Sequence, residues 1–293
     1  MTTRQNAPSS KQMPSSGDSV AMAIWLIESN LTTGISLEEI AGTVGLSRFQ
    51  LSRLFGRRIG LPVMGYLRAR RLSEAAEVLA AGASDILTVA LDAGYGSHEA
   101  FTRAFRDQFG LAPEDVRAMG NTQSIRLMEA HRMAQREFVD LEEPRFVTGQ
   151  AQLIAGISER YSFSDTAGIP LQWQRFGPHI GHVPNQRGMI CYGVCYNHTE
   201  NCQFDYLCGV GIARADDLPN GFTLVRLMEQ TYAVFTHRGH ISAIPQTIST
   251  IWQKWLPESG YQLIEAPDFE LYDQRFDSQT GRGEVEIWLP IRR

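Results

Sequence analysis

The sequence predicts a multi-domain chain in which an all-α domain with two helix-turn-helix motifs precedes an α+β domain. The first observation is a helix-turn-helix pattern that occurs twice, about fifty residues apart, in the first 120 of 293 residues. The second is a change of composition beyond residue 145, where aromatic residues concentrate in segments typical of β-strands. The third is an order of strand, helix, strand and strand that recurs in this region. It predicts two pseudo-symmetric units with a cleft between them.

The first helix-turn-helix pattern follows an expected helix over residues 18–29, for which Asp18 is the expected cap. Within the pattern, Ser36 can cap a helix through its hydroxyl oxygen. Gly45 allows the left-handed turn to the second helix, and Gly60 ends that helix. Many helix pairs turn on a glycine, so this pattern alone indicates DNA binding only weakly.

The second pattern matches the first at its start, turn, cap and stop. The corresponding residues are Asp85, Gly94, Ser97 and Gly110. A duplicate that agrees at all of these positions is strong support for a domain that binds duplex DNA.

An arginine cluster lies between the two patterns, where a long helix from Pro62 to Leu79 is expected. From Arg48 to Arg71 there are seven arginines and no acidic residue, although the net charge of the chain is −5. A solvated helical face would usually alternate bases with acids. The cluster therefore predicts contacts with the phosphates of DNA.

The expected domain boundaries follow the changes in composition. Residues 1–17 are rich in Ser, Gln, Pro and Thr and are expected to be disordered. Residues 18–120 form the first domain, residues 121–144 a linker, and residues 145–293 the second domain. Its expected strands are Phe146–Ile157, Met189–Cys195, Tyr206–Ala213, Thr223–His237 and Val285–Ile291.

The chain has no apolar signal core, and no apolar run reaches the roughly 18 residues that a membrane span needs. We therefore expect a cytoplasmic protein without a membrane partner. Its cysteines, Cys191, Cys195, Cys202 and Cys208, surround His198 and contain enough ligands for zinc. The paired CxxC spacing is missing, so no metal and no cofactor are expected, while zinc, redox and purely structural roles all stay open.

The first 120 residues resemble the DNA-binding domain of the AraC/XylS family at Tyr66–Leu72, Gly94–Ser97, Ala100–Gly110 and Pro113. The resemblance implies base contacts from the second helix of each motif. In the first motif only the arginine of the family's Trp, Gln and Arg is kept. In the second, Glu99 either accepts from cytosine or repels phosphate. The expected DNA-binding residues are Arg48, Phe49, Ser52, Arg53, Arg57, His98, Glu99, Thr102 and Arg103.

Residues 145–293 resemble a GyrI-like effector-binding domain, at Tyr192–Val194, Tyr232–Gly239, Trp255–Tyr261, Phe269–Tyr272 and Glu286–Ile291. The resemblance implies that Glu270 contacts a ligand. A carboxylate among aromatic rings attracts a cationic or amphipathic molecule, and a solvent-facing strand residue is the alternative. The expected ligand-binding residues are Glu270, Tyr272, Glu286, Trp288, Tyr192 and Trp173.

Together these features predict a sequence-specific transcriptional regulator, and an activator in particular, whose second domain binds a small effector. Its expected partners are double-stranded promoter DNA, RNA polymerase and that effector. One alternative is a GyrI-like small-molecule hydrolase or sequestrant. Another is a second domain that binds only protein partners. No nucleophile and base are arranged for catalysis in the sequence, so an enzyme is not expected.

Overall fold

A computed structural model describes residues 18–131 and 138–293, and the chain divides into two compact units. One unit contains the residues up to Ser47 together with Met64–Ala134. The other contains Arg48–Val63 together with Gln135–Arg293. The N-terminal tail expected over residues 1–17 lies outside the described residues. The linker expected over residues 121–144 stays a prediction, although its described parts contain no helix or strand.

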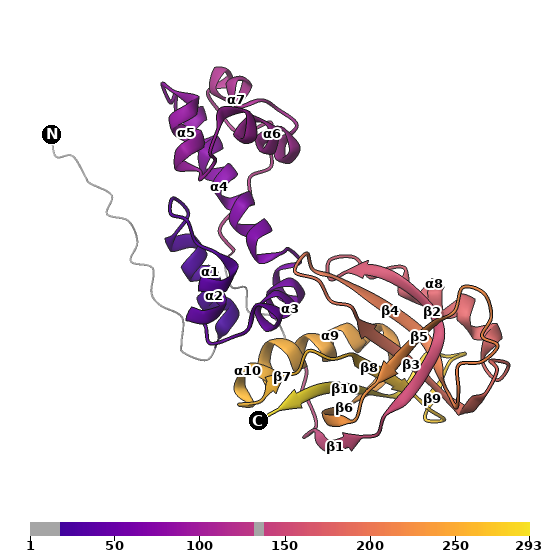
Figure 1. The fold of residues 1–293 in the computed structure, drawn as a ribbon. Coiled ribbons are helices and arrows are strands. Elements are labelled where there is room, and N and C mark those ends of the chain that lie inside the picture. The colour runs from indigo at the N-terminus through magenta and orange to yellow at the C-terminus, as the bar shows by residue number, and fades with distance from the viewer. Residues whose placement is uncertain (1–17, 132–137) are drawn as a thin grey trace. The chain divides into compact units, whose positions relative to one another are not determined.

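The first unit is helical, as predicted (Figure 1). Four of the expected N-terminal caps are made by a side chain that accepts a hydrogen bond from the helix backbone: Asp18, Ser36, Asp85 and Ser97. These bonds satisfy backbone N–H groups that have no partner within the helix. The helices are α1 (Ser19–Ser29), α2 (Leu37–Thr43), α4 (Val63–Ala80), α5 (Ile86–Asp92), α6 (His98–Phe109) and α7 (Pro113–Met119).

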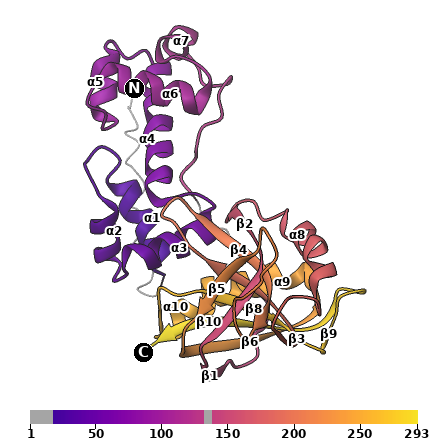
Figure 2. The ribbon, with the colours of Figure 1, turned by 45° about the vertical axis from the view of Figure 1, so that its right-hand side comes forward.

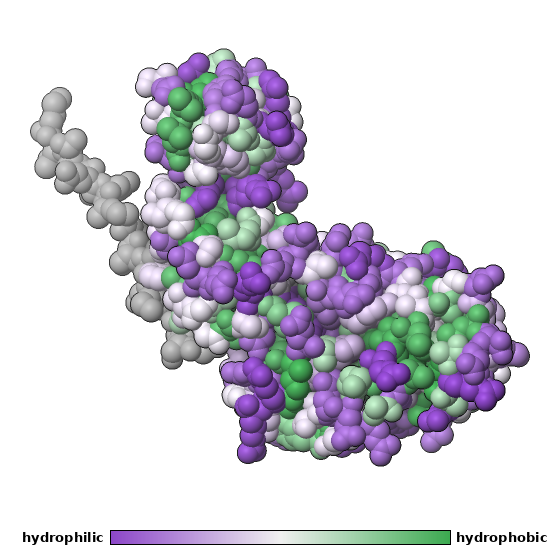
Figure 3. All heavy atoms as spheres, in the orientation of Figure 1, coloured by the Kyte–Doolittle hydropathy of each residue, from purple (hydrophilic) through white to green (hydrophobic). Residues whose placement is uncertain are grey.

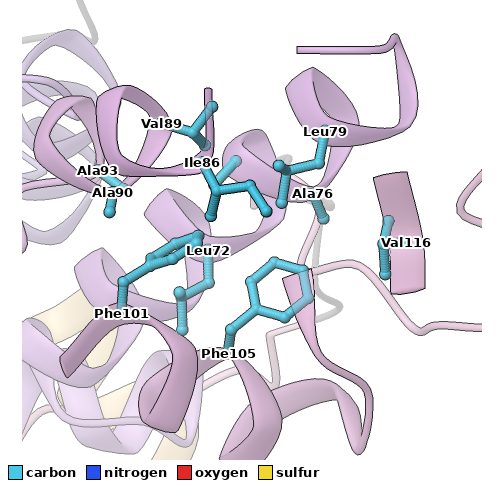
Figure 4. Close-up of a cluster of buried hydrophobic side chains, with 11 residues drawn as sticks. Leu72, Ala76, Leu79, Ile86, Val89, Ala90, Ala93, Phe101, Phe105 and Val116 are labelled. Carbon is cyan, nitrogen blue, oxygen red and sulfur yellow. The ribbon is translucent and has the colours of Figure 1, made fainter. Parts of the chain in front are cut away.

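A buried apolar cluster holds the second helix-turn-helix motif together (Figure 4). Helices α4, α5, α6 and α7 all contribute to it. The turn between α5 and α6 uses Gly94 at a φ of +80°, a left-handed conformation that favours glycine. The labelled members of the cluster are Leu72, Ala76, Leu79, Ile86, Val89, Ala90, Ala93, Phe101, Phe105 and Val116.

Two arginines of the predicted phosphate-binding cluster point inward in this unit. Arg70 on α4 binds the carboxylate of Glu28 on α1 through Nε and Nη2, at 2.8 and 3.0 Å. Its Nη1 donates to the carbonyl oxygen of Met128 at 2.7 Å. Arg71 donates from Nε to the carbonyl oxygen of Leu31 at 2.6 Å. Because these guanidinium groups fasten helix to helix and helix to loop, they do not support the expected phosphate contacts.

The second unit contains a curled antiparallel sheet with the strand order β1-β6-β10-β8-β3-β4-β2-β5 (Figures 1 and 2). Short strands β7 and β9 also pair with β10. The bounds are β1 (Arg145–Gly149), β2 (Gln152–Ser162), β3 (Gln186–Tyr196), β4 (Gln203–Ile212), β5 (Thr223–Leu227), β6 (Gln230–His240), β7 (Gln262–Leu263), β8 (Asp268–Tyr272), β9 (Phe276–Asp277) and β10 (Arg282–Arg292).

Two of the expected strands are wrong as single strands. Residues 146–157 belong to β1 and β2, and residues 223–237 belong to β5 and β6. The breaks face one another, because β1 pairs with β6 while β2 pairs with β5. Each long segment therefore changes its pairing partner midway. These two segments therefore connect the β1–β6 end of the strand order to the β2–β5 end, and the sheet curls.

The predicted repeat of strand, helix, strand and strand is confirmed. The first half is β2, α8 (Ile169–Phe176), β3 and β4. The second is β6, a helical segment, β8 and β10. The halves meet where β3 pairs with β8. The helical segment of the second half consists of α9 (Ile244–Thr250), the π-helical turn η3 (Ile251–Trp255) and α10 (Leu256–Glu258). Single 3-10 turns lie at Gly177–His179 and Ile241–Ala243.

The two faces of the sheet carry separate apolar clusters. Adjacent residues such as Cys191 and Tyr192 belong to different clusters, because successive side chains of a strand point to opposite faces. Phe176 of α8 packs with the cluster that contains Cys191, so α8 covers that face. The face of each unit that Figure 3 shows mixes polar and apolar patches. Among the described residues, no helix combines the length and apolar character needed to cross a membrane.

The second unit also includes α3 (Arg48–Ile59), the second helix of the first helix-turn-helix motif. Its Gln50 donates from Nε2 to the carbonyl oxygen of Leu263 at 3.1 Å. A Cβ atom on Gly56 would lie 2.5 Å from Sγ of Cys202 and 2.9 Å from the ring of Phe163. The absence of a side chain at this position is therefore what lets α3 approach the sheet unit so closely.

Candidate functional site

Glu270 lies at the junction of the two halves, on β8 opposite Gly193 of β3. Its Oε2 accepts hydrogen bonds from the hydroxyls of Tyr206 at 2.7 Å and Tyr272 at 2.8 Å. Trp173 of α8 donates from Nε1 to the Tyr206 hydroxyl at 3.1 Å. A Cβ atom at Gly193 would lie 2.7 Å from Oε2, so this glycine leaves the space that the carboxylate occupies. One carboxylate and three aromatic side chains therefore form a single polar network.

The environment of Glu270 favours its neutral form more than water does. Burial raises the pKa of Glu270, and hydrogen bonds from Tyr206 and Tyr272 oppose that rise. Burial also raises the pKa of both tyrosines, so they remain donors near neutral pH. The side chain of Glu270 is nevertheless only partly buried. A positively charged ligand would stabilise the ionised form of this acid and form an ion pair with it.

Glu286 and Trp288 form a second group on the opposite face of the sheet. Trp288 donates from Nε1 to Oε2 of Glu286 at 3.0 Å. Oε1 of Glu286 accepts from Arg145 at 2.8 Å and from Arg275 at 2.7 Å. A cavity of about 320 Å³ lies here, lined by Glu142, Glu143, Arg145, Val234, Thr236, Arg238, Arg275, Glu284 and Glu286.

The structure thus separates the six expected ligand residues into two groups. Glu270, Tyr272 and Trp173 lie together, whereas Glu286, Trp288 and Tyr192 lie on the other face. The register explains this, because Glu270 pairs with Ile287 of β10, and both neighbours of Ile287 therefore point away from Glu270. The single pocket implied by the resemblance is not assembled from all six side chains.

Two residues of the Glu270 site were not singled out in the sequence. Tyr206 is the first residue of an expected strand, and nothing in that strand marks it as a hydrogen-bond donor. Asp268 carries a clearer signal, because it precedes Glu270 by two residues and must share its face of β8. Asp268 is buried, and its carboxylate binds α3.

The arginines of α3 meet Asp268 within the second unit. Nη2 of Arg53 lies 2.6 Å from Oδ1 of Asp268, and Nη2 of Arg57 lies 3.2 Å from Oδ2. Both guanidinium groups also lie over the ring of Trp252, at 4.5 and 4.2 Å from its centroid. Only 1% of Arg53 is exposed, and Ser52 is also buried. Two residues expected to contact bases are therefore covered in this structure.

His198 adjoins this ion-pair cluster without adding charge to it. Burial lowers the pKa of His198 to about 2, and the nearby Arg53 acts in the same direction. Burial alone would raise the pKa of Asp268, but Arg53 and Arg57 together lower it. Near neutral pH the cluster therefore contains two guanidinium charges beside an ionised Asp268 and a neutral imidazole.

The remaining expected DNA contacts of α3 are more accessible. Arg48 is exposed and lies 3.8 Å from Glu200, a distance at which solvent screens the pair. Phe49 is partly buried, and its ring lies nearly perpendicular to the imidazole of His198.

Helix α6 presents two of its four expected DNA-binding residues fully to solvent. Glu99 and Arg103 are exposed, and His98 and Thr102 are partly buried. His98 lies 3.3 Å from Glu114. Bonds from its own backbone amide and from Ser97 lower the pKa of Glu99, so its carboxylate also stabilises the first turn of α6.

The cysteines give no support to a metal centre. In the described parts of the chain, no three side chains of His, Cys, Asp or Glu are grouped to hold a metal ion. Burial raises the pKa of Cys191 and Cys202 to about 11. Both therefore remain thiols near neutral pH, which is the form least suited to metal binding or nucleophilic redox chemistry.

Comparison with known proteins identifies the families of both parts of the chain. A family model described as a GyrI-like small molecule binding domain matches residues 142–292, and a helix-turn-helix domain model matches residues 40–119. The right origin-binding protein of Escherichia coli K12 is 28% identical over 287 residues, covering 93% of this chain and 97% of that protein. The transcriptional regulator Rob of Salmonella typhimurium matches with the same identity and coverage.

A solved structure of an AraC-type transcriptional regulator from Chromobacterium violaceum is 30% identical, with a TM-score of 0.34. It covers 36% of this chain and 94% of that one. The GyrI-like model spans more than half of the present chain. The chain therefore belongs to the GyrI-like small molecule binding domain family, with an AraC-type helix-turn-helix domain before it, as in transcriptional regulators of the Rob type.

Proposed function

We propose that this protein reads promoter DNA with α6 and α3 and binds a small cationic, amphipathic effector at Glu270. The observation that carries the proposal is a partly buried carboxylate held in a network of three aromatic side chains. We also propose that the protein activates transcription through contact with RNA polymerase. A run-off transcription assay with purified polymerase tests that role, and an unchanged or reduced transcript would contradict it.

The DNA part of the proposal rests on the exposed residues of α6. Arg103 is exposed, and a guanidinium group can pair with O6 and N7 of guanine. Glu99 is fixed at the first turn of the same helix, where its carboxylate can accept from N4 of cytosine. Arg103 would thus recognise a guanine as a donor, and Glu99 would recognise a cytosine as an acceptor.

Replacing Arg103 by alanine should weaken binding to the preferred duplex by about 1–3 kcal/mol and relax the preference at one base pair. The loss follows from one missing bidentate contact. Fluorescence anisotropy with the preferred duplex and with single-base variants measures it. Arg106→Ala, at an exposed position of the same helix, is the matched control and should affect all duplexes alike. An Arg103→Ala protein with unchanged base preference would exclude a base contact.

The effector part follows from the hydrogen bonding of the Glu270 carboxylate, which leaves one of its oxygens available to a ligand. Both tyrosine hydroxyls bond to Oε2, and among the described residues no hydrogen bond reaches Oε1. A cation could therefore pair with the carboxylate without displacing either tyrosine. The rings of Trp173 and Tyr272, whose centroids are 5.1 Å apart, offer apolar surface beside the charge. This combination suits an amphipathic cation better than a small inorganic ion.

Glu270→Gln should lower the affinity for tetraphenylphosphonium about a hundredfold, because a desolvated cation–carboxylate contact is worth a few kcal/mol. The substitution keeps the shape of the side chain and removes its charge. Binding is measured by titration of tryptophan fluorescence, with triphenylphosphine oxide as the neutral comparison. The affinity for this neutral molecule should change little.

Glu286→Gln is the matched control, since it removes the other expected acid from the opposite face. It should leave cation binding nearly unchanged if Glu270 is the receptor. If Glu286→Gln abolishes binding and Glu270→Gln does not, the effector occupies the cavity beside Arg145 and Arg275. If neither protein nor the wild type binds the cation, the proposed effector class is wrong.

A further inference from the structure

Helices α3 and α6 are duplicates in sequence but not in environment. Arg53 and Arg103 occupy equivalent positions of the two helix-turn-helix patterns, followed at the same distance by Gly60 and Gly110. Arg103 is exposed, whereas 1% of Arg53 is exposed. Seven of the twelve residues of α3 are buried, against two in α6. Tertiary contacts specific to α3 therefore cover a surface that its duplicate leaves free.

The contacts that cover α3 come from both halves of the sheet unit. Trp252 and Asp268 of the second half hold the guanidinium groups of Arg53 and Arg57. From the first half, the ring of Phe163 lies 4.9 Å from the guanidinium carbon of Arg57. Each arginine thus has an aromatic face on one side and a carboxylate at its end. This is the environment that the proposed effector would seek.

Glu270 connects this cluster to the effector site. It follows Asp268 by two residues and points to the same face of β8. The charge of Arg57 acts on Glu270 and tends to lower its pKa, although burial dominates. The α3 arginines and a cation bound at Glu270 would therefore compete for one acidic region formed by Asp268 and Glu270.

Several hydrogen-bond donors buried in the contact between α3 and the sheet lack partners among the described residues. Nε and Nη1 of Arg53 and Nε of Arg57 are buried without a hydrogen-bond partner among the described residues, as is the hydroxyl of Ser52. Unpaired buried donors cost free energy, so they weaken the docked state of α3. The same donors would find partners on phosphates and base edges. Docking is therefore suited to reversible exchange rather than permanent burial.

We propose that α3 is an internal ligand of the effector site, and that a cationic effector displaces Arg53 and Arg57 and frees α3 for DNA. The inference rests on the proposed function of Glu270 and adds its regulation. In the absence of effector, the chain reads DNA through α6 alone. When an effector neutralises the acidic region, α3 loses its anchor and the second recognition helix becomes available. By linkage, DNA bound to α3 raises the affinity for effector by the same factor.

The test uses the full-length chain, tetraphenylphosphonium, and a labelled duplex selected from random sequence by the wild-type protein. Calorimetry first establishes whether the cation binds. Hydrogen exchange without DNA should then show faster exchange at α3 amides in the presence of cation, with α6 unchanged. The affinity for the duplex should rise about tenfold at saturating cation, within the usual range of allosteric coupling.

Gly56→Ala disrupts the docking of α3 without changing any charge. The added methyl group would lie 2.5 Å from Sγ of Cys202 in the docked state, and alanine also favours the free helix. We expect this variant to bind the duplex about tenfold more tightly without cation and to gain little from it. Gly42→Ala is the control, because a Cβ atom at this position of α2 meets nothing within 4 Å.

Asp268→Asn provides a second route to the same state by removing the anchor of both arginines. Asp205→Asn, which loses a carboxylate bonded to Arg160 in the same unit, is its control. If the cation binds but neither α3 exchange nor DNA affinity changes, the coupling is overturned while the effector site stands. If Gly56→Ala binds DNA no better than Gly42→Ala, docking does not mask α3. If the cation does not bind, the proposed effector site falls and the coupling falls with it.

Discussion

Gly156→Ala should destabilise the sheet unit by about 3 kcal/mol or more, because its new methyl group would meet backbone that cannot move aside. Gly156 of β2 pairs with Gly209 of β4. A Cβ atom at Gly156 would overlap the carbonyl oxygen of Cys208 and lie 2.6 Å from the Cα of Gly209. Relief would require the central β2–β4 pairing to separate. Chemical denaturation followed by tryptophan fluorescence measures the change, since four of the five tryptophans lie in this unit beyond residue 145.

Gly211→Ala provides the comparison for this prediction. It adds the same methyl group to β4, where the nearest atom is on the ring of Tyr192 at an ordinary contact distance of 3.8 Å. Both variants lose a glycine from a strand, so effects on the unfolded chain are shared. Equal stability of the two proteins would show that the sheet tolerates the clash and that β2 and β4 are not tightly held.

Arg70→Ala should lower the stability of the helical unit by about 3–5 kcal/mol, because it breaks a buried ion pair by removing one of its two partners. The side chains of Arg70 and Glu28 are each 8% exposed. After the substitution, the carboxylate of Glu28 retains the hydrogen bond from the hydroxyl of Tyr66, at 2.8 Å. Loss of helical circular dichroism during chemical denaturation measures the effect.

Two further proteins test the cause of that loss. Arg68→Ala removes an exposed arginine from the same helix and should change stability by less than about 0.5 kcal/mol. The double variant Arg70→Met, Glu28→Leu replaces the buried pair by apolar side chains and should recover most of the stability. If the double variant is as unstable as Arg70→Ala, the arginine contributes through its bonds to the Met128 carbonyl and to Glu74 rather than through its pair with Glu28.

The helical unit could be predicted in detail from the sequence because its signals are local. A cap such as Asp85 bonds to amides two and three residues later, and a turn such as Gly94 depends on its own backbone angle. The prediction was strengthened because the same pattern of caps and turns occurs in two separate segments. The repeated strand, helix, strand and strand order was visible for the same reason, since each half is a contiguous stretch of chain.

The sites depended on partners far away in the sequence. Glu270 and Glu286 belong to one predicted pocket by resemblance, but the pairing of Glu270 with Ile287 places the two acids on opposite faces. A shift of one residue in that register would have reversed the outcome. Periodicity within β8 could identify which residues share a face. It could not identify which face of β10 they meet.

The contrast between Arg53 and Arg103 shows the limit most directly. The sequence by itself determined two equivalent recognition helices, because caps, turns and apolar spacing are encoded within each motif. Only the tertiary structure decided that Arg53 is buried against Asp268, 215 residues later, while Arg103 faces solvent. Burial of a charge depends on whether an opposite charge and an aromatic face arrive from elsewhere in the fold. No local pattern carries that information.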